Sequence, residues 1–342
     1  MRALRFVSPG QLPELVVLPD PSVKHPDDVL IQISFSGICG SDLKVLEGRY
    51  PARTGVILGH EASGVVVETG TYVKTLRPGD RVVAGIVPFC TLCSECRRGR
   101  PTLCEKRREV EVGIWSHGTF AELYLSRERV VYRLPDEIRL DLGALVEPMA
   151  CVLASLNRVN LSYMQTALII GAGPIGLLFE SVLSQRGLRT RILEKNGYRI
   201  QFAKEREIGV LSSDLRDEDI LTSVPEGCFD IVVDTVGSLL PRAVRLCHPG
   251  GHIILFGLDS VRGEQVSESE IVAKELTITG SIDCYDTIQY AISLLSRQPS
   301  FQNIITTCSS LEKYQEAFSM LGFPDDRARR SMKHIFQMGK EL

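Results

Sequence analysis

Residues 167–178 read Ala-Leu-Ile-Ile-Gly-Ala-Gly-Pro-Ile-Gly-Leu-Leu, an apolar run that leads into a G-x-G-x-x-G motif. A strand, this motif and a helix in succession are typical of the first turn of a dinucleotide-binding domain. In that turn Gly171 permits the tight bend, Gly173 lets the backbone approach a pyrophosphate, and Gly176 lets helix and strand pack closely. An α/β domain that binds no nucleotide is the alternative interpretation.

The glycine motif is followed by a helical run that begins at Pro174 and Ile175 and ends near Gly187. A helix N-terminus offers free N–H groups and the positive end of a dipole, which suit phosphate groups. We therefore include Pro174 and Ile175 in the predicted coenzyme-binding turn, and we expect Gly187 to adopt a left-handed conformation at the end of the helix.

An acidic residue, Glu194, stands eighteen positions after Gly176, at the end of the next strand-like run. A carboxylate there accepts hydrogen bonds from the adenosine ribose and repels a 2′-phosphate, so it favours NAD over NADP. Lys195 and Arg199 follow directly, and either could meet a phosphate. The charge pattern predicts NAD as the preferred coenzyme, with these two cations as the counter-argument.

The sequence changes character near residue 150. After it, strand-like runs alternate with helical runs, which predicts a doubly wound parallel sheet. The expected domains are 1–148, 149–284 for the nucleotide-binding part, and 285–342 as a return to the first domain. The strand-like runs are Ala167–Ile170, Thr190–Glu194, Phe229–Asp234, Gly251–Gly257, Leu276–Gly280 and, in the return segment, Lys333–Gln337.

Residues 1 to about 140 read as a β-rich body. Short runs rich in β-forming residues are separated by turn signals such as Arg77-Pro-Gly-Asp80, where proline fixes φ and glycine supplies a left-handed position. The expected strands are Val29–Ser34, Ala62–Glu68, Arg81–Ala84 and Phe120–Tyr124.

Four cysteines, Cys90, Cys93, Cys96 and Cys104, lie within one short segment of this body. Such spacing lets four thiolates converge on one Zn²⁺, and a closed tetrahedron of protein ligands is the arrangement of a structural zinc site. Disulfides fit poorly, because adjacent C-x-x-C pairs bridge awkwardly and the N-terminus lacks a signal-peptide core. The sequence predicts a structural zinc lobe in a reducing cytoplasm.

A second set of metal-ligand types is spread more widely: Cys39, the pair His60 and Glu61, and Glu147. Three protein ligands and one open position form the usual catalytic zinc site. Zinc lowers the pKa of an oxygen bound at the open position. Together with a dinucleotide cradle, this set predicts reversible oxidation of an alcohol, with zinc as a second, catalytic ion.

Composition excludes several other classes of protein. The 342 residues are 44% hydrophobic and 24% charged with a net charge of −3, which gives no electrostatic reason to expect nucleic acid or an anionic membrane as partner. No apolar run approaches the length of about 20 residues that a membrane span needs. The partner that we expect is a small-molecule alcohol or ketone.

The motifs together resemble the zinc-dependent medium-chain dehydrogenase/reductases over nearly the whole chain. The matching stretches are GICGSD at 37–42, GHEASG at 59–64, the four-cysteine lobe and GAGPIG at 171–176. The sequence is most similar to the polyol group, which includes sorbitol, galactitol-phosphate and threonine dehydrogenases. The resemblance implies a GroES-like catalytic domain beside a Rossmann domain, with Cys39, His60 and a glutamate on the catalytic zinc. It leaves open whether Glu61 or Glu147 binds directly.

Further roles come only from this resemblance. Ser41 matches the hydroxyl that hydrogen-bonds the reacting oxygen. Lys44 stands where many relatives have a histidine that ends the proton relay; it could donate to the substrate or the ribose instead, and a solvated side chain is the alternative. Tyr50, Trp115 and His117 fall where relatives line the substrate cleft. A packed loop residue is an equal alternative for Trp115, and His117 is open between ligand contact and a loop hydrogen bond.

The expected activity is zinc-dependent oxidation of a secondary alcohol, in a polyol, cyclitol or amino-alcohol, to a ketone. The alternatives are a biosynthetic ketone reductase, an epimerase or lyase that retains NAD, and a non-catalytic zinc-binding protein. We also expect a homodimer or homotetramer, since the run around Glu275–Ser281 would be an edge strand that needs covering.

Overall fold

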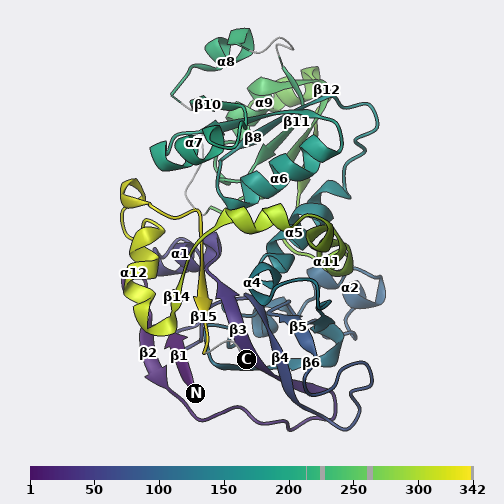
Figure 1. The fold of residues 1–342 in the computed structure, drawn as a ribbon. Coiled ribbons are helices and arrows are strands. Elements are labelled where there is room, and N and C mark those ends of the chain that lie inside the picture. Colours follow the sequence, from purple (N-terminus) through teal and green to yellow (C-terminus); the bar gives the residue numbers. More distant parts are fainter. Residues whose placement is uncertain (213, 224–227, 260–264, 340–342) are drawn as a thin grey trace. The chain divides into compact units, whose positions relative to one another are not determined.

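The computed structural model describes residues 1–212, 214–223, 228–259 and 265–339. The chain divides into two compact units, which Figure 1 shows by sequence colour. The β-rich unit comprises Met1–Ala150 and Asp283–Leu342, and the α/β unit comprises Cys151–Ile282. Helix α5 (Val146–Leu156) contains the first change from one unit to the other.

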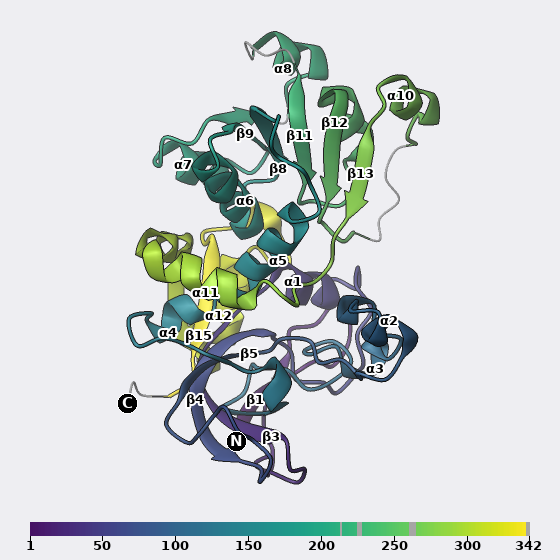
Figure 2. The same ribbon diagram turned by 90° about the vertical axis from the view of Figure 1, so that its right-hand side faces the viewer.

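The α/β unit is built on a six-stranded sheet in the order β10-β9-β8-β11-β12-β13, and every neighbouring pair is parallel. Counted along the unit, this order is 3-2-1-4-5-6, which is the doubly wound arrangement of dinucleotide-binding domains. Figure 2 shows strands of this sheet with the helices that flank them. The predicted fold class is thereby confirmed. The strands are β8 (Thr166–Ile170), β9 (Arg189–Glu194), β10 (Val210–Ser212), β11 (Phe229–Asp234), β12 (Cys247–Leu255) and β13 (Thr277–Gly280).

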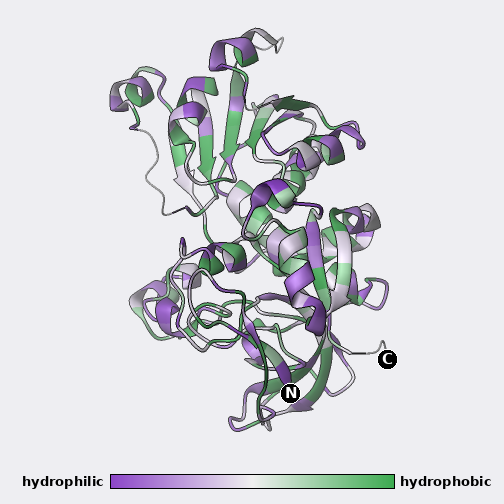
Figure 3. Cartoon of the chain, turned by 90° about the vertical axis from the view of Figure 1, so that its left-hand side faces the viewer, coloured by the Kyte–Doolittle hydropathy of each residue, from purple (hydrophilic) through white to green (hydrophobic). Residues whose placement is uncertain are grey.

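Hydrophobic burial explains why these strands lie at the centre of the unit. All five residues of β8 are buried, as are five of the six residues of β11 and the last three of β9. Strands covered on both faces read as continuous apolar runs, and Figure 3 shows the hydrophobic colour along them. The helices of this unit are α6 (Pro174–Gln185), α7 (Gly197–Lys204), α8 (Asp217–Ser223), α9 (Leu240–Leu246) and α10 (Glu268–Ala273).

The strand predictions for this unit differ from the structure mainly at the ends. Phe229–Asp234 coincides with β11, whereas β12 begins four residues before the predicted Gly251. Strand β10 was not predicted, because three residues are too few for a periodic pattern. Helix α6 ends at Gln185, and Gly187 has the expected positive φ of 89°.

The β-rich unit contains a seven-stranded sheet in the order β14-β15-β3-β4-β5-β7, with β6 also paired to β3, and a separate two-stranded sheet, β1-β2. Phe120–Tyr124 was predicted as a strand, but β6 begins only at Leu123. The predicted turn at Arg77–Asp80 is present, with φ of 93° at Gly79. The strands are β1 (Arg2–Arg5), β2 (Glu14–Val17), β3 (Asp28–Gly37), β4 (Glu61–Thr69), β5 (Arg81–Ala84), β6 (Leu123–Arg127), β7 (Tyr132–Arg133), β14 (Ile305–Ser310) and β15 (Lys333–Gln337).

Three neighbouring strands of this sheet bring distant parts of the chain together. Strand β3 pairs antiparallel with β4 so that Gly37 lies opposite Glu61, and it pairs antiparallel with β15 so that Gly37 also lies opposite Ile335. The returning segment therefore joins the sheet at the end of β3, one strand away from the start of β4.

Short helices complete the β-rich unit. Among the described residues, no helix is long and apolar enough to cross a membrane. The helices are α1 (Gly40–Leu46), α2 (Ser94–Arg97), α3 (Arg107–Val110), α4 (Leu140–Gly143), α11 (Ile288–Arg297) and α12 (Tyr314–Met320).

Candidate functional site

Cys39, His60 and Glu61 form a cluster in the β-rich unit that could hold a metal. One ligand atom of each, a sulfur, a ring nitrogen and a carboxylate oxygen, lies within 4.8 Å of the other two. Cys39 is the N-cap residue of α1, and Glu61 is the first residue of β4. The cluster therefore forms where α1 and β4 begin. Cys39 and His60 come together there although they are 21 positions apart in the chain.

Asp42 fixes the two loops that carry these ligands. Its buried carboxylate accepts a hydrogen bond from the Cys39 N–H at 2.8 Å and another from the Gly59 N–H at 3.2 Å. Burial raises the pKa of Asp42, and His60 and the two N–H groups partly offset that rise. Asp42 belongs to the GICGSD stretch, but the sequence analysis assigned it no role.

Glu61 forms a buried ion pair with Lys333, the first residue of β15. The two side chains are only 1% and 3% exposed, and the Lys333 Nζ also donates to the Ile38 carbonyl at 3.0 Å. A Cβ at Gly37 would lie 2.4 Å from a Glu61 carboxylate oxygen, so only glycine leaves room for the pair. Burial alone would lower the pKa of Lys333, but Glu61 and Cys39 outweigh it and raise the pKa.

Lys333 was not predicted as a site residue. The only signal in the sequence is that a lysine opens a short run, Lys333–Gln337, that is otherwise suited to burial. A long-range contact of this kind follows from strand register, which the sequence alone does not give.

The polar atoms of this cluster fit a bound cation and a bound alcohol. The His60 Nδ1 and the Ser41 Oγ are buried without a hydrogen-bond partner among the described residues, an arrangement that is costly unless a ligand satisfies them. Burial lowers the pKa of His60, but Cys39, Asp42 and Glu147 together raise it well above its usual value. The surroundings of His60 are thus strongly negative and suit a metal ion.

Glu147, at the start of α5, is one of the groups whose charge acts on His60, which places it near the cluster. Within the β-rich unit, a Glu147 carboxylate oxygen also lies within 4.8 Å of the Cys284 sulfur. Glu61 is therefore the carboxylate grouped with Cys39 and His60, and Glu147 lies beside them.

The four cysteines of the lobe converge as their spacing predicts. Their sulfur atoms lie within 4.8 Å of one another, and the Sγ atoms of Cys90 and Cys96 are 3.9 Å apart. A tetrahedron with Zn–S bonds of about 2.3 Å has sulfurs about 3.8 Å apart, so the lobe has the right size. All four thiols are free of disulfides.

The electrostatics of the lobe also favour a cation. The Cys93 N–H is the main group that lowers the pKa of Cys90, to about 6, whereas burial and the neighbouring thiols raise the pKa of Cys96 to about 12. Four thiolates cannot coexist at this distance without a positive ion, and zinc deprotonates the thiols that it binds.

In the α/β unit, the glycine motif has the geometry that its three roles require. A Cβ at Gly176 would lie 1.9 Å from the Gly171 carbonyl, so glycine is needed where helix and strand meet. Gly171 has φ of 105°. A Cβ at Gly173 would meet nothing closer than 3.6 Å, which leaves open backbone at the N-terminus of α6. Such a cradle could accept a pyrophosphate, and Pro174 and Ile175 form the first turn of the helix beside it.

Glu194 ends β9 and holds this cradle. Its buried carboxylate accepts hydrogen bonds from the N–H groups of Ala172 at 2.7 Å, Lys195 at 2.8 Å and Asn196 at 2.9 Å. Arg199 lies 3.6 Å from it, and the Arg199 Nε is buried with no hydrogen-bond partner among the described residues. Lys195 is exposed. The turn therefore presents one carboxylate and two cations.

The residues predicted to line the substrate cleft lie in the β-rich unit. The half-buried Tyr50 hydroxyl donates to Glu111 at 3.2 Å, and the Trp115 N–H donates to the Glu111 carbonyl at 2.9 Å. The exposed His117 accepts from the Ile57 N–H at its Nδ1, and burial together with Arg53 lowers its pKa. Lys44 is half-buried on α1, and its carbonyl accepts the Tyr50 N–H.

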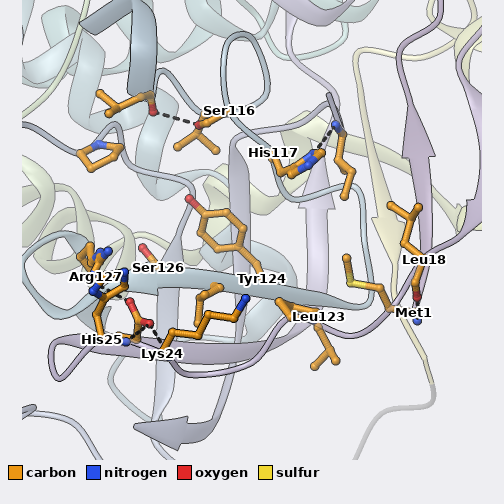
Figure 4. Close-up of a pocket in the computed structure, with 18 of the residues that line it drawn as sticks. Met1, Leu18, Lys24, His25, Ser116, His117, Leu123, Tyr124, Ser126 and Arg127 are labelled. Carbon is orange, nitrogen blue, oxygen red and sulfur yellow. Dashed lines mark hydrogen bonds and ion pairs between the residues drawn. The ribbon is translucent and has the colours of Figure 1, made fainter. Parts of the chain in front are cut away.

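His117 also borders a cavity of about 660 Å³, which Figure 4 shows with Tyr124 at its centre. Its lining comes from the N-terminal segment, β6 and the turn around Ser116, and it includes none of the three clustered metal ligands. The chemistry discussed above therefore lies elsewhere in the unit.

Comparison with known proteins agrees with this geometry. The model of the alcohol dehydrogenase GroES-like domain matches residues 25–136, and the model of the zinc-binding dehydrogenase matches residues 174–297. D-xylulose reductase A of Aspergillus oryzae is 31% identical over 320 residues, which cover 88% of each chain. The chain belongs to the zinc-dependent medium-chain dehydrogenase/reductase family. D-arabinitol dehydrogenase 1 of Uromyces fabae is 28% identical over 94% of each chain.

Solved structures lead to the same family. Galactitol-1-phosphate dehydrogenase of Escherichia coli is similar with a TM-score of 0.87 and 25% identity, over 98% of this chain and all of that one. This medium-chain dehydrogenase is thus an oxidoreductase that uses zinc and a nicotinamide coenzyme to convert an alcohol into a ketone. The predicted family, reaction class and GroES-like and Rossmann architecture are confirmed.

Proposed function

We propose that this dehydrogenase oxidises a secondary alcohol of a polyol to the ketone and reduces NAD. The observation that carries the proposal is the convergence of Cys39, His60 and Glu61 beside the unpartnered Ser41 hydroxyl. The similarity to enzymes named for D-arabinitol and D-xylulose supports the polyol class.

Cys39, His60 and Glu61 would hold the catalytic zinc, and Glu147, whose charge acts on His60, would exchange with Glu61. When bound, the zinc supplies Lewis acidity to the alcohol and the nicotinamide accepts the hydride. The Ser41 hydroxyl accepts a hydrogen bond from the substrate hydroxyl and so positions the departing proton. Lys333 balances the charge of Glu61, and Asp42 holds the Cys39 and Gly59 backbones so that the ligands stay in place.

The first test is a substrate panel of polyols, cyclitols and amino-alcohols, followed by NADH absorbance, with zinc counted in the same preparation. We expect two zinc ions per chain and oxidation of at least one polyol. One zinc per chain without turnover would instead support a non-catalytic protein, and NAD that stays bound after purification would favour an epimerase or lyase.

The glutamate pair gives a sharper test of the ligand set. If Glu147 can replace Glu61 on the zinc, Glu61→Gln and Glu147→Gln should each lower kcat modestly. The double variant should lower kcat by more than the product of the two single-variant factors. Additive effects would show that the two carboxylates act independently.

The preference for NAD rests on Glu194, whose carboxylate would repel a 2′-phosphate. Glu194→Ser should raise kcat/KM with NADP relative to NAD, and Glu205→Ser, an exposed glutamate of the same unit, should leave the ratio unchanged. A parent enzyme that already prefers NADP would show that Lys195 and Arg199 dominate.

The oligomer and the compartment belong to the same proposal. Strand β13 ends the six-stranded sheet and, among the described strands, pairs only with β12. A second copy pairing along β13 would cover this edge, so we propose a homodimer or a tetramer built from it. Light scattering at micromolar concentration should exclude a monomer. The free thiols of the zinc lobe support the reducing cytoplasm as the compartment.

A further inference from the structure

Four side chains of the β-rich unit form a charged network that the reaction described above does not use. The Arg107 guanidinium donates to Glu111 at 2.9 Å and to Asp283 at 3.2 Å, and the Tyr50 hydroxyl donates to the same Glu111 oxygen at 3.2 Å. The side chains of Arg107, Glu111 and Asp283 are 19%, 10% and 13% exposed. We call these four residues the Arg107 cluster.

The cluster borders the metal site through two of its members. Tyr50 binds the Lys44 carbonyl on α1, the helix that Cys39 caps. Gly113, two residues after Glu111, lies so close to Gly59 that a Cβ on it would be 2.9 Å from the Gly59 nitrogen, and His60 follows directly.

The third connection is through Asp283, whose neighbour Cys284 has its sulfur within 4.8 Å of a Glu147 carboxylate oxygen. Three separate segments thus join the Arg107 cluster to Cys39, His60 and Glu147.

The charges of the cluster leave no cation free for a ligand. Arg107 is shared by two carboxylates, so the cluster carries one net negative charge and its guanidinium is already occupied. A phosphate group carries up to two negative charges, and like charges that approach in a poorly solvated site repel strongly. Phosphate sites in proteins are built instead on arginines that are free to donate.

The hydrogen-bonding capacity of Tyr50 points in the same direction. A carboxylate only accepts hydrogen bonds, so the Tyr50 hydrogen is committed to Glu111. The Tyr50 oxygen also interacts with the Arg107 side chain, so one phenol lone pair remains to accept a hydrogen bond from a ligand. Such a phenol recognises a donor, such as an alcohol hydroxyl, and has nothing to offer a phosphate oxygen.

We propose that the Arg107 cluster selects unphosphorylated polyols and rejects their phosphate esters, with Tyr50 accepting a hydrogen bond from a substrate hydroxyl away from the reacting carbon. Glu111 acts as a positioning residue that orients Tyr50, and Arg107 and Asp283 hold Glu111. This inference rests on the proposed polyol oxidation and names its substrate class. One relative is named for a free polyol, D-arabinitol, and another for a phosphate ester, galactitol 1-phosphate. Preference for the free polyol and preference for the ester are therefore two distinct outcomes of a test.

The test compares kcat/KM for one free polyol and for its terminal phosphate ester, in the zinc-loaded enzyme with saturating NAD. We expect the parent to favour the free polyol at least tenfold. Glu111→Gln removes the excess negative charge and should lower that preference at least tenfold, mainly through KM. Glu109→Gln is the matched control, because Glu109 is an exposed glutamate of α3, the helix that ends just before Glu111, and it pairs only loosely with Lys106, at 3.6 Å.

Two further variants keep the test decisive if Glu111→Gln folds poorly. Asp283→Asn removes the same unit of charge and should also admit the ester. Tyr50→Phe keeps every charge and removes the acceptor, so it should weaken the free polyol at least fivefold without helping the ester. Binding without turnover can be followed by the fluorescence of Trp115, the one tryptophan of the chain, in the absence of coenzyme.

A parent enzyme that favours the ester, or charge variants that keep the parent preference, would overturn the inference while the proposed oxidation stands. If no polyol or ester is oxidised, the proposed function fails. The Trp115 titration then still decides the inference, which is overturned if the ester binds as tightly as the free polyol.

Discussion

The two metal-ligand clusters of the β-rich unit differ in how the chain brings their members together. The lobe takes all four cysteines from one segment, 90–104, and three of them are only partly shielded by the rest of the fold, whereas Cys104 is buried. The cluster at Cys39 takes its ligands from two loops and a strand, and it depends on Asp42 and on the buried Lys333. A local cluster can form from a short segment and serve stability, whereas a cluster assembled over long range is held rigidly enough for chemistry.

The largest contrast should appear when a ligand of each cluster is removed. Cys39→Ser or His60→Ala should lower kcat/KM by at least about a thousandfold, or about 4 kcal/mol of transition-state stabilisation, because the Lewis acid is lost. Thermal unfolding and NAD binding should change little, since the coenzyme cradle lies in the α/β unit. Initial rates, zinc content and a melting curve check this, and a Cys39→Ser, His60→Ala double variant with the parent rate would refute the mechanism.

The support of the cluster can be tested through Lys333. Lys333→Met leaves Glu61 as a buried, unpaired carboxylate, which should cost about 3–5 kcal/mol of unfolding free energy in the zinc-free protein. Bound zinc would compensate the charge, so the loss should shrink when zinc is added. Denaturant unfolding with and without zinc measures both, with the exposed Lys313→Met as control. An equal loss in the two states would show that Glu61 does not face the metal.

In the lobe, loss of a ligand should affect stability more than activity, the reverse of the Cys39 cluster. Cys93→Ala should lower the melting temperature by more than about 5 °C, since structural zinc contributes directly to folding, while kcat at low temperature stays near the parent value. Cys308→Ala, at an exposed cysteine of β14, serves as control. Parent-like melting of Cys93→Ala would mean that the lobe adds nothing to stability.

The smallest effect concerns β15 itself, the strand that carries Lys333. Burial lowers the pKa of His334 to about 4, and its ring nitrogens lie 2.9 Å and 3.0 Å from the hydroxyls of Thr307 and Ser309. The unfolded chain binds a proton at His334 more readily than the folded protein does. The stability that the neutral His334 contributes is therefore fully present above about pH 6.5. It is lost as the pH falls toward 4, which lowers the free energy of unfolding by at most about 3 kcal/mol.

This pH effect can be measured as the difference in unfolding free energy between pH 7 and pH 4.5. His334→Asn should show a shallower fall with acid than the parent protein, even if it is less stable at neutral pH. Parallel curves for the two proteins would assign the acid sensitivity to other groups.

The same contrast between local and distant contacts explains what could be read from the sequence. The lobe and the glycine motif were recognisable because their functional residues lie within fifteen positions or fewer, so spacing nearly determines geometry. The parallel sheet followed from the alternation of elements, apart from the three-residue β10. The ion pair of Glu61 with Lys333 spans 272 positions and depends on the register of β3 with two neighbours, which no local pattern encodes.

The position of β15 in its sheet has a consequence for synthesis of the protein. Strands β3 and β4 leave the ribosome long before β15 does, because the whole α/β unit is made between them. Only then can β15 pair with β3. At about 5–20 residues per second, the synthesis from β4 to β15 takes roughly 15–50 s. During that interval the Phe35–Gly37 end of β3 lacks its partner β15, which leaves an unpaired strand edge for association with other chains, and Glu61 lacks the lysine that neutralises it. The emerging chain is therefore most vulnerable to aggregation just when its coenzyme-binding half is already able to fold, and chaperones would be needed most at that stage.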